Sequence, residues 1–106
     1  MRLLPNFFVF SSPLDREENE PKSCFIALNI HEGITDFVDH IEQDTLLSVV
    51  SYTKKEDFFF TFDHYYSCYL VEVHLKETDS MQALSCEQVA IAETYSYLSQ
   101  RTVKDK

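Results

Sequence analysis

Apolar and polar side chains alternate along several parts of the chain, and this period of two predicts β-strands. The clearest alternation covers 65–77, where Val71 faces one side of the expected strand and Glu72 faces the other. A turn at 54–57 and a tight reversal at 63–64 are expected to separate the later strands. The expected strands are 6–12, 23–30, 45–53, 58–62 and 65–77, although 46–50 could instead prolong the helix before it.

The hydrophobic period changes to that of a helix over 34–43, directly after Gly33, which marks a turn. Apolar residues recur there at i, i+3, i+4 and i+7, the spacing that places them on one side of an α-helix. The opposite side of this helix is acidic. The sequence therefore predicts an amphipathic helix whose apolar stripe consists of Ile34, Phe37, Val38 and Ile41.

The last third of the chain is also expected to be helical. Two first turns are possible, because Asp79 with Gln82 and Ser85 with Gln88 both match the spacing of a capping box. The sequence leaves both starts open. The stripe expected to face the core consists of Leu84, Ile91, Tyr95 and Leu98.

The order of these elements, β-β-α-β-β-β-α, predicts an α+β fold. We expect an antiparallel sheet of about four to five strands with two helices packed on one face. A chain of 106 residues has room for one good core, so 1–106 is expected to form a single domain. Within this domain, 13–22 is expected to be an acidic loop and 102–106 a flexible basic C-terminus.

The charge of the chain limits the partners it can have. Eighteen Asp and Glu stand against nine Lys and Arg, and the formal net charge is −9. DNA, RNA and anionic membrane surfaces are polyanions, so we expect no direct contact with nucleic acid or membrane. A hydrophobic content of 44 % with nine Phe and six Tyr excludes a disordered acidic tail.

Glycine usage excludes the common nucleotide-binding motifs. Gly33 is the only glycine, whereas P-loops, dinucleotide fingerprints, kinase glycine loops and nucleophile elbows each need two or more glycines at fixed spacing. An EF-hand also fails, because Gly33 is not surrounded by the required acidic ligands. We therefore expect no cofactor.

The cysteines favour a reducing compartment. Cys24, Cys68 and Cys86 are odd in number and form no CxxC pair, so neither a disulfide framework nor a zinc ribbon is indicated. Each lies among apolar residues and is expected to be a small buried side chain in a cytoplasmic protein. The alternative of a signal peptide over 1–12 is not favoured, because Pro5 interrupts the apolar run and no small-x-small cleavage site follows.

No residue pattern predicts catalysis or metal binding. The four histidines form no HxH or HExxH spacing, so they are expected to be surface or capping residues rather than metal ligands. Cys68 and His64 lie four strand residues apart, roughly 12–13 Å, which is too far for thiol activation. No pair of carboxylates is marked as buried. We therefore expect a protein that is not an enzyme.

Acidic residues are concentrated in the middle of the chain, where thirteen lie between Glu32 and Glu93 against three lysines. On the helix over 34–43 they lie opposite the apolar stripe, and like charges at that spacing cost about 0.2–0.5 kcal/mol per pair. Tyr69 and Tyr95 share faces with apolar residues and are expected to be packed. The expected partner-binding residues are Glu32, Asp36, Asp39 and Glu42 on the helix and Asp63, Tyr65 and Tyr66 near the hairpin tip.

These observations lead to one hypothesis and several alternatives. Carboxylates spaced along a surface can resemble phosphates to a basic groove. The leading hypothesis is a small non-enzymatic inhibitor, monomeric or homodimeric, that occupies the basic, often nucleic-acid-binding, surface of a protein partner. Phage anti-restriction and anti-CRISPR inhibitors share this small, acidic, motif-free character, which is an analogy and not a sequence match. The alternatives are an immunity protein, a dimeric secretion chaperone, or a small Cys- or carboxylate-dependent enzyme. The acidic residues could also serve only to keep the protein soluble.

Overall fold

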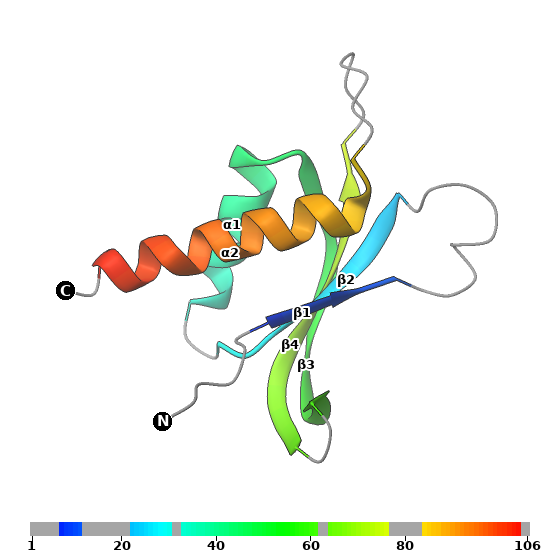
Figure 1. Cartoon of the computed structure of the whole chain (residues 1–106), viewed down its shortest axis with the longest axis vertical. Helices are drawn as coiled ribbons and strands as arrows, with labels where there is room; N and C mark the ends of the chain where they lie inside the picture. The colour runs from blue at the N-terminus through cyan, green and yellow to red at the C-terminus, as the bar shows by residue number, and fades with distance from the viewer. Residues whose placement is uncertain (1–6, 12–21, 31–32, 62–63, 77–83, 105–106) are drawn as a thin grey trace.

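The computed structural model describes residues 7–11, 22–30, 33–61, 64–76 and 84–104 (Figure 1). They form a four-stranded antiparallel sheet, in the order β1-β2-β4-β3, and two helices. The expected α+β class is thereby confirmed. The elements are β1 (Phe7–Phe10), β2 (Ser23–Leu28), α1 (Ile34–Asp44), β3 (Leu47–Thr61), β4 (His64–Leu75) and α2 (Cys86–Lys104).

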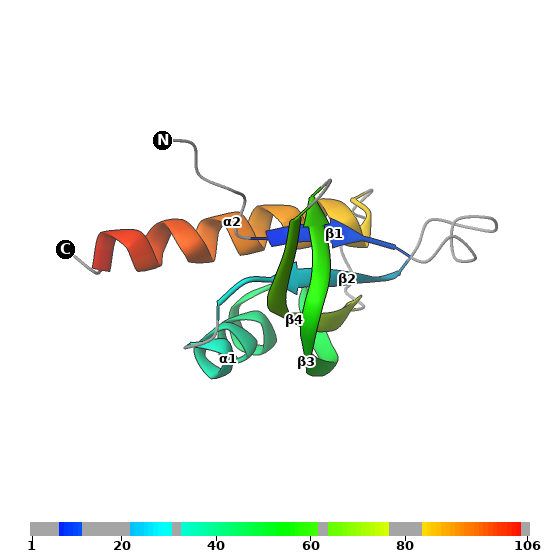
Figure 2. The ribbon, with the colours of Figure 1, turned by 90° about the horizontal axis from the view of Figure 1, so that it is seen from below.

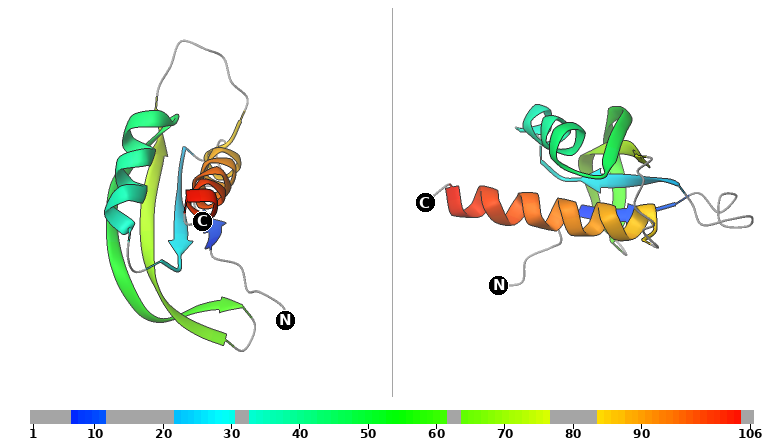
Figure 3. Two further views of the ribbon diagram at one scale, coloured as in Figure 1. Left: turned by 90° about the vertical axis from the view of Figure 1, so that its left-hand side faces the viewer. Right: turned by 90° about the horizontal axis from the view of Figure 1, so that it is seen from above.

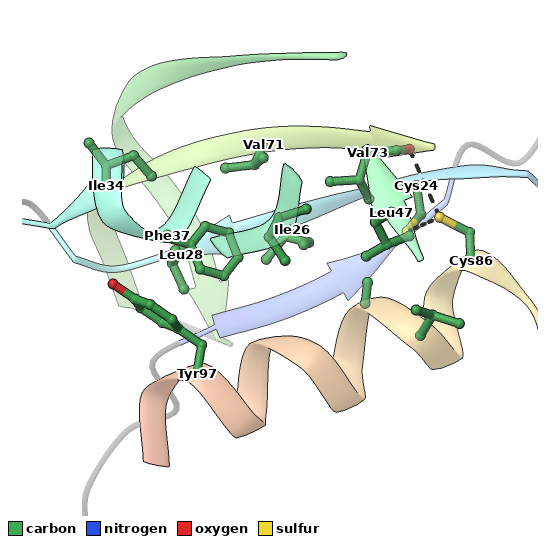
Figure 4. Packing of buried hydrophobic residues seen from close by; sticks show 13 residues of the cluster. Cys24, Ile26, Leu28, Ile34, Phe37, Leu47, Val71, Val73, Cys86 and Tyr97 are labelled. Carbon is green, nitrogen blue, oxygen red and sulfur yellow. Dashed lines mark hydrogen bonds between the residues drawn. The ribbon is translucent and has the colours of Figure 1, made fainter. Parts of the chain in front are cut away.

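Both helices pack on one face of the sheet and share one core. Helix α1 lies beside β3, and α2 lies beside β1 and β2 (Figure 3). Alternate residues of β2 and β4 face this core, and Phe37 of α1 fills its centre (Figure 4). Its ring meets Tyr97 of α2 edge-on, with ring centroids 5.3 Å apart. The fully buried members from the sheet are Cys24, Ile26, Leu28, Leu47, Val71 and Val73.

Strand β3 differs from the expectation, because it continues through 54–57 where a turn was predicted. Lys54 still pairs with Tyr69 and Lys55 with Cys68 on β4. Three register shifts each insert one extra residue into β3, and Asp57 adopts a φ of 56° at one of them. Such bulges bend a strand without ending its pairing. The charged segment therefore lies on the edge strand of the sheet, where exposed charges oppose pairing with another sheet.

Hydrogen bonds stabilise both ends of helix α1. Gly33 precedes it with a left-handed φ of 91°, and its carbonyl accepts a hydrogen bond from the Phe37 amide at 3.0 Å. At the other end the Lys76 ammonium donates to the carbonyls of Glu42 at 2.8 Å and Thr45 at 3.0 Å. A cation at these carbonyls interacts favourably with the negative end of the helix dipole. Lys76 thus supplies the positive charge that the last turn of α1 lacks.

Helix α2 begins at the second of the two starts that the sequence left open. The Ser85 hydroxyl accepts a hydrogen bond from the Gln88 amide at 3.2 Å, and the Gln88 side chain accepts one from the Ser85 amide at 3.0 Å. This reciprocal pair is a capping box. The helix continues to Lys104, so it includes the first three residues of the segment expected to be a basic tail. Its C-terminal part extends beyond the strands (Figure 2).

The stripe expected to be the core side of α2 was predicted wrongly at three of its four residues, whereas Leu98 does pack against the core. Leu84, Ile91 and Tyr95 are 44 %, 48 % and 67 % exposed, so the expectation that Tyr95 is packed is also wrong. The helix has apolar or small residues on two sides, and its period alone does not show which side meets the sheet. The buried side instead contains Cys86, Val89, Ala90, Thr94 and Tyr97.

Candidate functional site

The acidic side of α1 lies on the surface of the molecule. Burial of Ile34, Phe37 and Ile41 turns the opposite side of the helix outward, and Asp36 and Asp39 are both exposed there. In the part of the chain that the structure describes, neither carboxylate forms an ion pair. Two of the predicted binding residues are therefore available together on one helix face.

Glu42 lies on the same helix but has a partner within the fold. Its carboxylate accepts a hydrogen bond from the Val49 amide at 2.8 Å, which ties the end of α1 to the start of β3. Its backbone carbonyl is one of the two that Lys76 binds. Glu42 is exposed, so it can still add negative charge to the surface. Its carboxylate, however, is already held by the hydrogen bond that connects α1 with β3.

His40 connects the acidic side of α1 with α2. Its Nδ1 lies 3.9 Å from the Asp44 carboxylate and its Nε2 lies 3.9 Å from that of Glu93. Its ring also lies against Tyr97, with centroids 5.3 Å apart. Asp44 lies at the C-terminal end of α1, where its negative charge is repelled by the negative end of the helix dipole. The acidic side of α1 thus extends from Asp39 to Asp44, although a negative charge at that position does not stabilise the helix.

The hairpin tip does not join this surface. Tyr65 and Tyr66 follow His64, the first residue of β4, at the end of the β3–β4 hairpin, whereas α1 packs near the start of β3 (Figures 1 and 3). Tyr65 is 65 % exposed, and Tyr66 packs on the opposite face of the sheet from the helices. Glu32 and Asp63 lie outside the described residues. The structure therefore brings Asp36, Asp39 and Glu42 together and places the two tyrosines elsewhere.

Sequence reasoning missed an aromatic cluster on the sheet face opposite α1 and α2. Phe10 of β1 stacks on Phe25 of β2 and on Phe58 of β3, with ring centroids 5.4 and 6.4 Å apart. Phe8, which is 40 % exposed, lies 5.7 Å from Phe10. The signal was present in β2, where apolar residues occupy both faces, as they do in strands covered on both sides. Stacked rings on an open sheet can bind bases, but the net charge of −9 opposes a nucleic acid here.

Two of the three buried cysteines form a pair that the sequence did not indicate. The sulfurs of Cys24 on β2 and Cys86 at the start of α2 lie 3.1 Å apart (Figure 4). The hydrogen bond from Cys24 lowers the pKa of the Cys86 thiol, and the same bond, together with burial, raises the pKa of Cys24. Burial raises the pKa of the third thiol, Cys68, which lies on the other face of the sheet. Of the three thiols, Cys86 is therefore the one whose pKa is lowered.

Within the residues that the structure describes, no group of three or more His, Cys, Asp or Glu side chains is placed to hold a metal ion. The helices in those ranges are also too short or too polar to cross a membrane. Comparison of the chain with models of protein families, with curated proteins and with solved structures gives no match.

Proposed function

We propose that this protein is a small non-enzymatic inhibitor that binds the basic surface of a protein partner through the acidic side of α1. The observation that carries the proposal is the exposed pair Asp36 and Asp39, which have no ion-pair partner in the described part of the chain. Carboxylates one helical turn apart present a row of negative charge to a groove that normally holds phosphates. We place the protein in the cytoplasm, which the three buried thiols support.

The test uses the partner isolated from the source cell by affinity purification and then purified as a probe. Reversal of Asp36 and Asp39 to Lys removes two attractions and adds two repulsions. At about 0.2–1 kcal/mol for each of these four exposed charge interactions, the double reversal should weaken binding by about 4-fold to several hundred-fold. It should also flatten the dependence of binding on salt.

A matched control variant distinguishes the effect of a charge on α1 from the effect of the net charge of the protein on binding affinity. Asp36→Lys and Glu56→Lys each change the net charge by the same amount, but Glu56 lies exposed on β3, far along the strand from α1. Asp36→Lys should weaken binding more than Glu56→Lys does. Equal effects, or unchanged affinity in the double reversal, would contradict the acidic-surface mechanism. Duplex DNA should compete with the protein if the partner's surface is a nucleic-acid groove.

A second candidate function is a chaperone that holds an apolar segment of another protein. The aromatic cluster on the sheet face opposite α1 and α2 favours it, because Phe8 is exposed beside the stacked rings of Phe10 and Phe25. This candidate predicts that the protein delays the aggregation of reduced insulin and that Phe8→Ser abolishes the delay. The double reversal of Asp36 and Asp39 should leave that delay unchanged, which distinguishes the two functions.

A further inference from the structure

The core contains two thiols that come from distant parts of the chain and meet between a strand and a helix. Cys24 lies on β2, and Cys86, 62 positions later, is the first residue of α2. Their sulfurs are 3.1 Å apart, and both side chains are fully buried free cysteines (Figure 4). Cys68 lies on the other face of the sheet. One covalent bond between Cys24 and Cys86 would therefore join the start of α2 to the sheet.

The start of α2 can open while the sheet stays intact. The two hydrogen bonds between Ser85 and Gln88 that cap the helix are exposed to solvent. Exposed hydrogen bonds at the end of a helix break in local openings that need far less free energy than unfolding of the whole protein. Such an opening carries Cys86 toward solvent, whereas Cys24 stays in β2, where it is paired with Val73 of β4. Cys86 is thus the thiol that a dissolved oxidant reaches first.

We propose that Cys24 and Cys86 form a reversible redox switch, in which low-molecular-weight disulfides such as oxidised glutathione fix the start of α2 to β2. The Cys86 thiol loses its proton and attacks one sulfur of glutathione disulfide, which forms a mixed disulfide and releases one glutathione thiol. The Cys24 thiol then loses its proton, attacks the Cys86 sulfur and releases the second glutathione. The protein loses two protons and two electrons, and one glutathione disulfide becomes two glutathione thiols. Excess reduced glutathione reverses both steps.

The fold favours the bond without making it permanent. Restriction of a loop of 62 residues in the unfolded chain corresponds to a preference of about 1,000-fold for the disulfide in the folded protein. The bond would lie beneath the exposed cap of α2, so reduced glutathione can reach it when the cap frays, and accessible disulfides are those that thiols reduce most readily. In the cytoplasm that we propose for this protein, disulfides are usually transient and respond to redox conditions.

The first experiment equilibrates the intact protein with mixtures of reduced and oxidised glutathione, blocks free thiols by alkylation and measures both forms by mass spectrometry. As the mixture changes from the redox poise of the cytoplasm to that of an oxidising compartment, the protein should lose two hydrogen atoms, and it should regain them when the mixture is reversed. The equilibrium constant for this oxidation should exceed that of the urea-unfolded chain by about 1,000-fold. A protein that stays reduced in every mixture, or stays oxidised in every mixture, would overturn the proposal.

Two variants test which thiols take part. Cys68→Ala is the matched control and should switch like the wild-type protein, because Cys68 lies on the other face of the sheet. Cys24→Ser should stop at a mixed disulfide between Cys86 and glutathione, which the wild-type protein resolves. A disulfide that includes Cys68, or a folded Cys24→Ser protein that binds no glutathione, would contradict the assignment of the pair.

The last experiment measures the access route in the wild-type chain, so it does not depend on how a variant folds. The reduced protein is treated with iodoacetamide in the absence of denaturant, and the modified cysteines are identified in peptides. Cys86 should react at least about 10-fold faster than Cys68, because local opening of α2 does not expose the other face of the sheet. Equal rates would mean that both thiols become accessible only by global unfolding, which refutes the switch. The switch uses neither Asp36 nor Asp39, so its failure leaves the proposed function in place.

Discussion

The sulfurs of Cys24 and Cys86 are close enough that a two-electron oxidant should join them into a disulfide. Their separation of 3.1 Å must fall to the S–S bond length of about 2 Å, a shift of about 1 Å between the start of α2 and β2. With oxidised glutathione as the oxidant, each pair of thiols loses two protons and two electrons, and one glutathione disulfide becomes two glutathione thiols. Both thiols are buried, so the oxidant reaches them when the start of α2 opens locally, and the lowered pKa favours Cys86 as the attacking thiol.

The stabilisation follows from the length of chain that the bond closes. Cys24 and Cys86 are 62 residues apart, and restricting a loop of that length in the unfolded chain contributes about 4 kcal/mol before any strain in the folded protein. With an m-value of about 1–3 kcal/mol/M, the urea midpoint should rise by roughly 1.5–4 M on oxidation. Urea unfolding of the oxidised and reduced forms, followed by circular dichroism, measures this difference.

The controls use the remaining cysteine. Cys68→Ala should keep the full rise in the midpoint, because Cys68 lies on the other face of the sheet. Cys24→Ala and Cys86→Ala should each lose it. Mass spectrometry of the oxidised protein should show the loss of two hydrogen atoms and one peptide linked through Cys24 and Cys86. If oxidation leaves both thiols free, or if the disulfide forms and the midpoint does not rise, the reasoning from proximity is wrong.

Three further changes test the packing of the core. Thr94→Val should raise the free energy of unfolding by about 1 kcal/mol in a urea titration, because the buried Thr94 hydroxyl has no hydrogen-bond partner in the described part of the chain. Phe37→Ala should lower it by about 3–5 kcal/mol, since the ring is fully buried against Tyr97, and a milder loss in Phe37→Leu would locate the effect in the cavity. Burial raises the pKa of Tyr97 above 10.0, so the unfolded tyrosine ionises first. Stability should therefore be complete below about pH 10 and fall as pH rises further, with a shallower fall in Tyr97→Phe if the assignment holds.

Local patterns predicted several elements well. The stripe of Ile34, Phe37 and Ile41 placed α1 correctly, because hydrophobic period and the turn at Gly33 are both encoded within a few residues. Alternation in β4 predicted the inward side of that strand. The capping box at Ser85 was recognised, but a second match at Asp79 left the start of α2 open. In the structure the Ser85 hydroxyl accepts the hydrogen bond from the Gln88 amide at the start of α2.

The acidic surface was predicted only in part. Asp36 and Asp39 are exposed together because their position follows from the helix period. Whether Tyr65 can join Asp36 and Asp39 in partner binding depends on the length of the β3–β4 hairpin. Strand β3 continues through 54–57, where the charged residues suggested a turn, so Tyr65 lies far from α1. Charged residues occur both in turns and on edge strands, and the choice between them depends on whether a partner strand continues alongside.

The sequence by itself determined the α+β class, the amphipathic α1 and the absence of glycine-rich phosphate loops, because period and composition are local properties of the chain. Only the tertiary structure decided which side of α2 is buried, and it thereby left Leu84, Ile91 and Tyr95 on the surface. It also decided that Cys24 meets Cys86 and that Phe10, Phe25 and Phe58 stack across three strands. These contacts join segments far apart in the chain, and they depend on strand order and helix packing, which no local pattern encodes.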